Sequence, residues 1–298
     1  MKKHRSLILA IVTMMLWGSL YPMVQKGFAA YEVNTTADIL LFAGIRFMVC
    51  GAAVCIYAAF KEKGSYRPVK KVIPGILWSG FFAIVLHYSF TYLGLDSTDS
   101  SKTALIKQVG SLFYVCFSFL FFKEDRPTVQ KIIAALAGFL GIVALNLSSE
   151  GITFSIGDLL ILGASFSLMF SNVISKKVFS VASPVTATGI SHFFGGVILL
   201  VVGIAMGGQV SFRLDSSLLI FAYICTASSV SYCLWFIVLK DGELSKLYII
   251  KFSEAIFTCI FGALIMKENI WKIQYLAALI LICGGILISN IKRKEKVA

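Results

Sequence analysis

The sequence is poor in charged residues. Only 14% of its 298 residues are Asp, Glu, Lys or Arg, whereas 58% are hydrophobic and the mean hydropathy is +0.87. This leaves too few polar groups to cover a water-soluble globule of that size, so a soluble enzyme and a disordered chain are excluded. The chain has long apolar runs instead. A membrane-spanning segment needs about 20 apolar residues, so the chain has room for roughly ten of them.

The chain also lacks the motifs of familiar catalytic chemistry. It contains no Walker A sequence, no GxSxG elbow and no HExxH pair, so neither ATP hydrolysis nor known membrane hydrolase chemistry has residues to carry it. Its seven cysteines all fall inside apolar segments without CxxC spacing, which is typical of small packing side chains rather than of disulfides or metal ligands. We therefore expect no enzyme activity, no cofactor and no metal site.

The net charge of +12 has a distribution that indicates membrane insertion. In a soluble chain such a charge would point to a nucleic-acid surface, but here Lys and Arg lie mainly in short connectors between apolar runs. If the amino terminus is placed in the cytoplasm, most of them fall on the cytoplasmic side of alternate connectors. The pattern predicts a multi-pass protein of the bacterial cytoplasmic (inner) membrane, with both termini in the cytoplasm and no nucleic-acid partner.

Ten apolar runs divide the chain. They occupy roughly residues 6–27, 36–60, 72–95, 101–122, 128–147, 156–178, 184–207, 216–239, 245–266 and 271–291. The breaks between them carry turn and cap residues such as Ser183-Pro184, where proline suits a first helical turn. The alternation of apolar and polar residues that is typical of a membrane β-barrel does not appear. The predicted fold class is an all-α integral membrane protein with ten transmembrane helices.

The second half of the sequence repeats part of the first. Shifting the chain by 144 positions aligns residues 88–146 with residues 232–290 without a gap. The identical pairs include Tyr88 and Tyr232, Lys107 and Lys251, Glu124 and Glu268, Gly141 and Gly285, and Asn146 and Asn290. Composition bias could supply some apolar matches by chance, but it does not readily supply these polar matches in one register.

Five spans in each half have a topological consequence. Because five is odd, the second half crosses the membrane in the opposite direction to the first. This predicts two inverted five-helix repeats, 1–149 and 150–298, around a central cavity. Such repeats are the architecture of alternating access, since a pseudo-two-fold axis in the membrane plane relates the inward and outward states and the substrate is held at the axis.

Several short motifs are spread over both halves. They are Leu16-Trp17-Gly18-Ser19, Gly44-Ile45-Arg46-Phe47, the run from His87 through Ser101-Lys102-Thr103-Ala104 to Phe122-Lys123-Glu124, and the repeat of that run in the second half. Together they resemble the drug/metabolite transporter superfamily, in particular its bacterial EamA-type ten-helix carriers. The resemblance covers essentially the whole chain. It implies a transporter with a central cavity lined mostly by the first, third, fourth, sixth, eighth and ninth helices.

The sequence departs from this family at one place. Many members have a proline in the middle of the fourth and ninth helices, where this chain has Gly110-Ser111 and Glu254-Ala255. The substrate site is therefore expected to differ from that of the typical member.

Three ionisable residues lie inside the fourth and ninth predicted spans. Lys107 and Lys251 occupy matching places, and Glu254 follows Lys251 by one turn. Each needs a partner or a water-filled cavity, because an ionisable group at mid-membrane costs about 2.5–3.5 kcal/mol on insertion scales. On the fourth span one polar stripe follows 3-and-4 spacing and consists of Thr103, Lys107, Gly110, Ser111 and Tyr114. We expect this stripe and its counterpart on the ninth span to face each other across a cavity.

Two interpretations of these charges stay open. In the functional one, the two lysines bracket a negatively charged part of the substrate, and Glu254 receives an amine or carries a coupling proton. In the structural one, Lys251 and Glu254 neutralise each other and Lys107 extends its ammonium group toward the outer face. The net charge of the three groups favours a small anion or a zwitterion over a lone organic cation.

Further side chains are expected around the same cavity. His87 and Tyr88 on the third span and Tyr232 on the eighth are candidate substrate contacts. Trp17 and Tyr21, four residues apart on the first span, are candidates for stacking on a planar substrate, with anchoring at the membrane interface as the alternative. Arg46 and His192, which occupy related places on the second and seventh spans, are assigned a gating or structural role.

Other features indicate helix packing. Small residues on the fifth and tenth spans, including Gly138, Gly141 and Gly285, suit contacts within the bundle or the seam of a homodimer. Glu268 ends the ninth span just before the last helix begins, where a carboxylate can offset the dipole at a helix amino terminus.

The sequence thus predicts a secondary active transporter or exchanger of a small organic metabolite, such as an amino acid, a derivative of one or an organic anion. Its expected partners are the lipid bilayer and an anionic or zwitterionic small molecule. A proton-coupled exporter of hydrophobic amines or drugs and a non-transporting membrane ligand sensor remain alternatives.

Overall fold

The structure is a computed structural model that describes residues 2–62, 69–117, 120, 128–145, 147–148, 151–152, 155–212, 215–241, 250–251 and 253–289. Helices dominate it. In the first half they are α1 (Lys2–Ala30), α2 (Thr36–Lys61), a third span made of α4 (Ile73–Gly80), η1 (Phe81–Leu86) and α5 (His87–Asp96), then α6 (Ser100–Phe117) and α7 (Val129–Leu145). In the second half they are α8 (Ile156–Val178), α9 (Pro184–Ala205), α10 (Ser217–Asp241), α12 (Ser253–Met266) and α13 (Ile273–Ser289).

The predicted all-helical class is confirmed. In the described part of the chain, the strands are the two-residue β1 (Leu147–Ser148) and β2 (Gly151–Ile152), which pair as an antiparallel hairpin between the halves. Six helical runs in this part are long and apolar enough to cross a membrane: Ser6–Ala30, Thr36–Lys61, Ile73–Asp96, Ile156–Val178, Pro184–Ala205 and Ser217–Lys240. Shorter apolar helices cover Ile132–Gly141, Ser253–Met266 and Ile273–Gly285.

Two helices begin with the same local device. The side chains of Thr35 before α2 and Ser155 before α8 each accept a hydrogen bond from the backbone N–H three residues later. In return, the carboxylates of Asp38 and Asp158 accept a hydrogen bond from the backbone N–H of Thr35 and Ser155. Such capping boxes satisfy N–H groups that have no partner inside the helix. They set the start of each helix from sequence alone.

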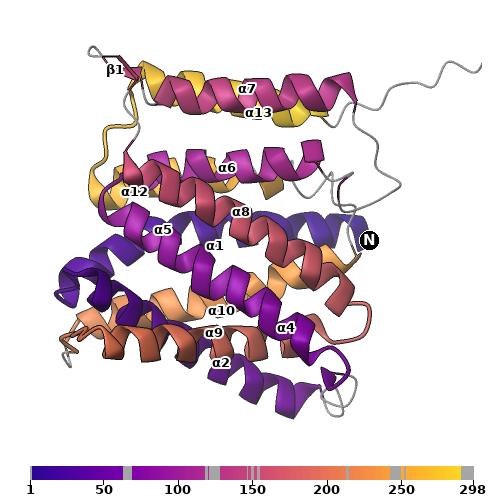
Figure 1. Cartoon of the computed structure of the whole chain (residues 1–298), viewed down its shortest axis with the longest axis vertical. Helices are drawn as coiled ribbons and strands as arrows, with labels where there is room; N and C mark the ends of the chain where they lie inside the picture. The colour runs from indigo at the N-terminus through magenta and orange to yellow at the C-terminus, as the bar shows by residue number, and fades with distance from the viewer. Residues whose placement is uncertain are drawn as a thin grey trace, which may run out of the picture.

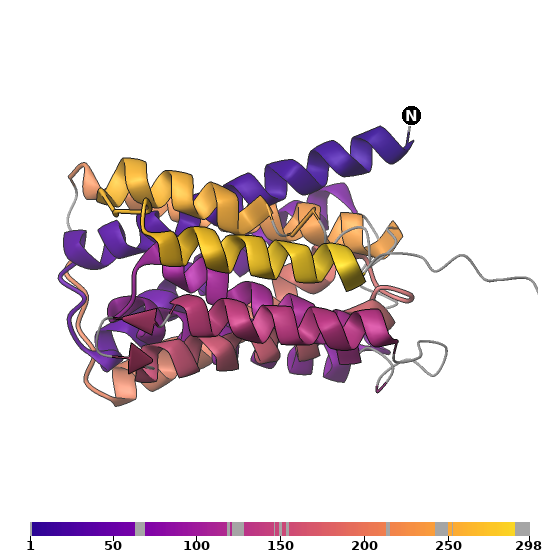
Figure 2. The same ribbon diagram turned by 90° about the horizontal axis from the view of Figure 1, so that it is seen from above.

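The pair α2 and α9 lies at one end of the long axis of the molecule, and the pair α7 and α13 lies at the other (Figure 1). The remaining helices, α1, α4, α5, α6, α8, α10 and α12, fill the space between these pairs (Figure 1). Seen from above, α7 and α13 run side by side (Figure 2). The main buried core lies among the central helices, with its largest side chains contributed by Trp235, Arg46, Tyr92 and Tyr232.

Glycines bring the backbones of α2 and α9 into direct contact. A Cβ added at Gly51 would lie 2.1 Å from the backbone nitrogen of Phe193, and one at Gly196 would lie 2.3 Å from that of Met48. No side chain fits at such distances. The two antiparallel helices therefore pack through matched small residues, which is how membrane helices approach closely.

The predicted small residues of the fifth and tenth spans serve a contact within the bundle. A Cβ added at Gly141 on α7 would meet Ile282 on α13 at 2.7 Å, and one at Gly285 on α13 would meet the carbonyl of Ala134 at 2.9 Å. Gly138 instead faces α6, where its Cβ would collide with Leu112.

The expectation for Glu268 was wrong in its target. Its carboxylate does not serve the helix that follows but the start of α6, where it accepts bonds from the backbone N–H groups of Ser100 and Ser101 at 2.8 and 3.0 Å. The reason is spatial: α12 packs beside α6, so the end of one lies next to the beginning of the other. A positive φ of 58° at Lys267 turns the chain there.

Candidate functional site

A small cavity lies between the two halves. Its volume is about 30 Å³, which is room for about two water molecules. Most of its walls come from α1, α5, α6, α10 and α12, with Arg46 of α2 and Leu168 of α8 added. The lining includes eight of the residues expected from the sequence: Trp17, Arg46, His87, Tyr88, Lys107, Tyr232, Lys251 and Glu254.

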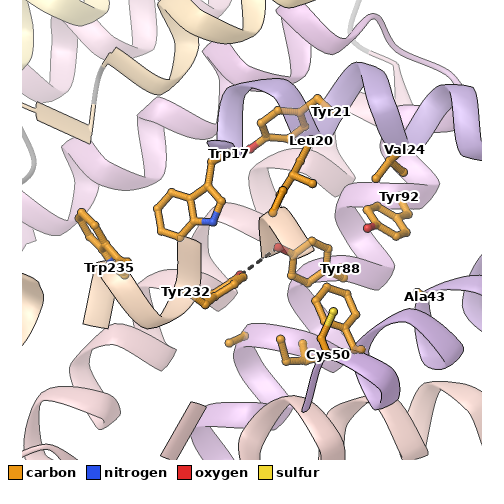
Figure 3. Packing of buried hydrophobic residues seen from close by; sticks show 14 of the residues in the cluster. Trp17, Leu20, Tyr21, Val24, Ala43, Cys50, Tyr88, Tyr92, Tyr232 and Trp235 are labelled. Atoms are coloured by element: carbon orange, nitrogen blue, oxygen red, sulfur yellow. Dashed lines mark hydrogen bonds between the residues drawn. The ribbon is translucent and has the colours of Figure 1, made fainter. Parts of the chain in front are cut away.

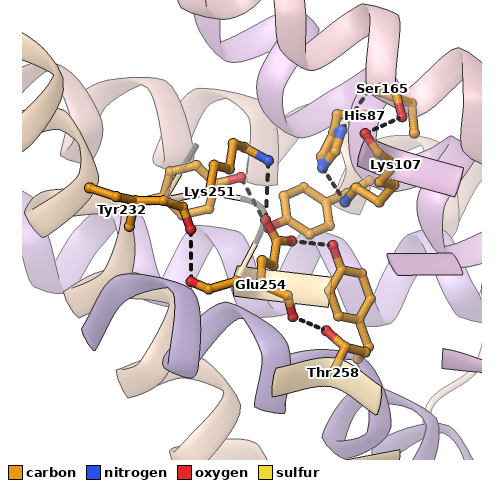
Figure 4. A network of polar contacts seen from close by, with 12 residues as sticks. His87, Lys107, Ser165, Tyr232, Lys251, Glu254 and Thr258 are labelled. Carbon is orange, nitrogen blue, oxygen red and sulfur yellow. Dashed lines mark hydrogen bonds and ion pairs between the residues drawn. The ribbon is translucent and has the colours of Figure 1, made fainter. Parts of the chain in front are cut away.

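Lys251 and Glu254 form a buried ion pair. The Lys251 Nζ lies 3.1 Å from Glu254 Oε2, and both residues are only 3% exposed (Figure 4). The other carboxylate oxygen accepts a 2.7 Å hydrogen bond from the Tyr21 hydroxyl of α1. The Lys251 ammonium also lies 5.6 Å from the ring centre of Trp17. Lys251 and Glu254 thus neutralise each other, as the structural interpretation of the sequence proposed for this pair.

Lys107 has a different environment. Its Nζ lies 3.1 Å from His87 Nε2, and its ammonium group lies 4.9 Å from the ring centre of Tyr21 (Figure 4). His87 Nδ1 lies 2.8 Å from the carbonyl oxygen of Ala164. Because that oxygen can only accept, Nδ1 carries the hydrogen and a neutral ring offers Nε2 as acceptor to the ammonium. In the part of the chain that the structure describes, Lys107 has no carboxylate partner.

Packing explains why the first half lacks a carboxylate beside its lysine. Gly110 occupies the place in α6 that Glu254 occupies in α12, three residues after the lysine. A Cβ added at Gly110 would lie 2.4 Å from the Cβ of Ser165 on α8. Any side chain is therefore excluded there, and His87 of the preceding span becomes the hydrogen-bond partner of Lys107 instead.

Tyr88 and Tyr232 join the halves at the cavity wall. Their hydroxyls lie 3.0 Å apart, and the two residues are separated by 144 positions, the offset of the repeat (Figure 3). Trp17 packs edge-on against Tyr232 at 5.4 Å between ring centres, and it is 7% exposed. Trp17 therefore forms part of the cavity wall.

Arg46 and His192 lie beside this tyrosine pair. Arg46 is fully buried, and its guanidinium carbon lies 5.6 Å from the ring centre of Tyr88. The His192 ring lies 4.5 Å from that of Tyr232. Arg46 lines the main cavity, whereas His192 packs against Tyr232 and does not line the cavity.

The remaining predicted residues belong to the polar stripe of α6. Ser111 is buried and lines a second, smaller cavity of about 10 Å³, which also contacts Lys107, Lys251 and Asn172. Both lysines therefore border two neighbouring cavities. Tyr114 belongs to α6, but its side chain lies outside the described part of the chain.

Sequence reasoning named Tyr21 only as a stacking candidate beside Trp17 and missed its hydrogen bond to Glu254. The sequence placed it four residues after Trp17, on the same face of the first helix, and so offered the signal. Its bond to Glu254 depends on the crossing of α1 and α12, where Gly18 brings the two backbones together. The carboxylate is therefore held from two sides, by Lys251, three residues earlier in the sequence, and by Tyr21 of α1.

Comparisons with known proteins agree with this architecture. The EamA-like transporter family matches residues 4–147 and again residues 155–290. A probable amino-acid metabolite efflux pump of Salmonella typhimurium is 25% identical over 93% of this chain and 83% of its own length. An uncharacterized transporter of Synechocystis is 26% identical over 91% of this chain and 86% of its own length.

A chloroplastic WAT1-related protein of Arabidopsis thaliana is 24% identical over 88% of this chain, which spans 65% of the length of that relative. One protein of known crystal structure superposes with a TM-score of 0.70 at 17% identity and covers 96% of both chains, which shows the fold alone. The family and the names of the relatives indicate a membrane transporter rather than an enzyme. This chain belongs to the EamA-like transporter family.

Proposed function

We propose that this protein is a secondary transporter that moves a small anionic or zwitterionic metabolite across the cytoplasmic membrane by alternating access. The observation that carries the proposal is the pair of repeated lysines, Lys107 and Lys251, which border one buried cavity between the halves. A buried ammonium group is costly in a membrane protein and is typical of substrate and ion pathways. A repeated one in a shared cavity is hard to explain by anchoring at the membrane surface.

The pattern of helix contacts supports two inverted repeats, 1–149 and 150–298. Exchanging the halves turns the contact of α1 with α10 into that of α8 with α5, and the contact of α1 with α12 into that of α8 with α6. The pairs α2 with α9, α6 with α12 and α7 with α13 map onto themselves. A residue that touches its own repeat partner, as Tyr88 touches Tyr232, lies on the pseudo-two-fold axis.

The small cavity volume supports alternating access. Space for about two water molecules cannot hold an amino acid, so the helices around the cavity must separate before a substrate binds. In a pseudo-symmetric molecule this opening has two equivalent directions, one for each side of the membrane. The lysine-rich connectors support a topology with both termini on the cytoplasmic side.

Charge supports an anionic or zwitterionic substrate. The Lys251–Glu254 pair is neutral as a unit, so Lys107 leaves one positive charge at this end of the cavity. The name of the Salmonella relative, a probable amino-acid metabolite efflux pump, fits a substrate that carries a carboxylate. An exported amine would need Glu254, whose two oxygens are engaged by Lys251 and Tyr21.

Counterflow in liposomes tests the proposal. Purified protein is reconstituted into vesicles loaded with one amino acid or monocarboxylate at a time, and exchange with the same labelled compound outside is measured. We expect the wild type to exchange at least one such compound and Lys107→Gln to lose this exchange. Lys61→Gln, which removes an exposed lysine at the end of α2, should keep it. Proton-driven flux of amines alone would support the drug-exporter alternative. Ligand-induced stabilisation without any flux would support a sensor.

A further inference from the structure

Arg46 is a buried cation that its surroundings do not neutralise. Its exposure is 0%, and one hydrogen bond is present, from Nη2 to the hydroxyl of Ser228 on α10. Two other donor atoms, Nε and Nη1, are buried without a hydrogen-bond partner. Within the described residues, no carboxylate forms an ion pair with it. A guanidinium in this condition needs an anion, because unpaired buried charge is strongly unfavourable.

The guanidinium borders the main cavity, and other unpartnered donors line the same space. The hydroxyls of Thr91 and Tyr92 on α5 and the indole N–H of Trp17 are also buried without a hydrogen-bond partner. The guanidinium carbon lies 5.7 Å from the ring centre of Tyr92. Native proteins leave few buried polar groups unpaired, so several of them around one cavity point to a ligand that accepts hydrogen bonds.

Aromatic rings surround the guanidinium of Arg46. Its guanidinium carbon lies 4.6 Å from the ring centre of Phe47 and 5.6 Å from that of Tyr88. The hydroxyl of Tyr88 is bonded to that of Tyr232 and is not directed to Arg46. Rings stacked near a guanidinium leave its N–H edge free for a planar acceptor.

We infer that Arg46 forms a second anion subsite in this cavity, distinct from the site of Lys107, which takes a carboxylate group or a halide on the guanidinium N–H groups that lack a partner. Nη2 has a second hydrogen besides the one given to Ser228, so it can form a two-donor fork with Nε or with Nη1, and such a fork matches a planar carboxylate. The hydroxyls of Thr91 and Tyr92 are additional donors on the same wall. The inference rests on the proposed function only in placing the subsite within the transport cavity.

Anion-dependent thermal unfolding of the purified protein tests the subsite without any transport assay. The unfolding midpoint is followed by intrinsic fluorescence while acetate or chloride replaces gluconate at constant ionic strength, because a ligand that binds only the folded state raises the midpoint. We expect the wild type to respond to both anions and Arg46→Gln to respond less, with the remaining response removed in the double variant Arg46→Gln/Lys107→Gln. Lys61→Gln, on the same helix, controls for loss of one positive charge.

Three results would overturn the subsite: no response in the wild type, an unchanged response in Arg46→Gln, or a response lost in Lys107→Gln and kept in Arg46→Gln. If Arg46→Gln does not fold, Arg46→Lys replaces it, since an ammonium group keeps the charge but lacks the planar fork. Its acetate affinity should fall about tenfold, and an unchanged affinity would again contradict the inference. A response to acetate but not to chloride identifies a carboxylate as the ligand. A missing counterflow signal, by contrast, would remove the proposed function and leave this result standing.

Discussion

The two lysine ends of the cavity are built from the same residue in two different settings. In the second half, Lys251 pairs with Glu254, three residues later in the sequence. In the first half, Lys107 bonds to the ring of His87 on the preceding span, and the place of the carboxylate is taken by Gly110. Within the described residues, one lysine therefore has a direct carboxylate partner (the neutral end) and the other has none (the cationic end), although the repeat placed an identical side chain at both.

This difference teaches that a repeat preserves position more faithfully than electrostatic role. The sequence repeat relates Tyr88 to Tyr232, and the fold brings their hydroxyls together. Neighbours that differ between the halves then decide what each side chain does. Here the contact of Gly110 with Ser165 leaves no room for a carboxylate three residues after Lys107.

The largest effect is expected when the neutral end loses its carboxylate. Glu254→Gln leaves the Lys251 ammonium buried without a counter-charge, and breaking such a pair from one side costs about 3–5 kcal/mol. The free energy of unfolding in detergent should fall by that amount. The double variant Lys251→Gln/Glu254→Gln removes both charges and should recover most of it. Equal stability of Glu254→Gln and wild type would show that the pair is not formed.

A methyl group at Gly110 tests the packing that makes the two ends differ. Gly110→Ala forces its Cβ against Ser165 of α8, and overpacking of this kind costs about 1–3 kcal/mol. The matched control is Gly284→Ala on α13, where an added Cβ meets nothing within 4 Å. Unfolding of both variants is compared under one condition, and an undisturbed Gly110→Ala would remove the steric explanation.

The tyrosine pair tests the symmetry that the ends share. Tyr88→Phe and Tyr232→Phe each leave the other hydroxyl without its partner, at a cost of about 1 kcal/mol. In a double-mutant cycle, we expect the two single variants to lose the same unfolding free energy and the double variant to lose less than the sum of the two losses. Additive effects would mean that the two hydroxyls do not interact.

The smallest stability effect is expected at the cationic end. Lys107→Gln removes a buried charge that has no carboxylate partner, and the amide can still donate to His87, so the unfolding free energy should change by less than about 1 kcal/mol. A loss as large as that of Glu254→Gln would reveal a counter-charge that neutralises Lys107 and would end the contrast between the two lysines.

Much of this arrangement is predictable from the sequence, and the rest depends on how helices cross. The lengths of the apolar runs predicted the helices, and the 144-residue offset predicted that Lys107 and Lys251 are equivalent. Both predictions use only the order of residues along the chain. The bond from Tyr21 to Glu254 and the cap that Glu268 forms on α6 join segments far apart in the sequence. Their geometry follows from interhelical angles and small-residue contacts, which no local pattern encodes.

The central claim is that Lys107, and not the neutral pair at the other end, supplies the charge that binds the transported anion. Its most direct test is the affinity of the exchanged substrate for Lys107→Gln and for Lys251→Gln/Glu254→Gln, measured by titration calorimetry on folded protein. The account predicts binding at least about tenfold weaker in Lys107→Gln and nearly unchanged in the double variant. Normal binding in Lys107→Gln together with lost binding in the double variant would contradict it.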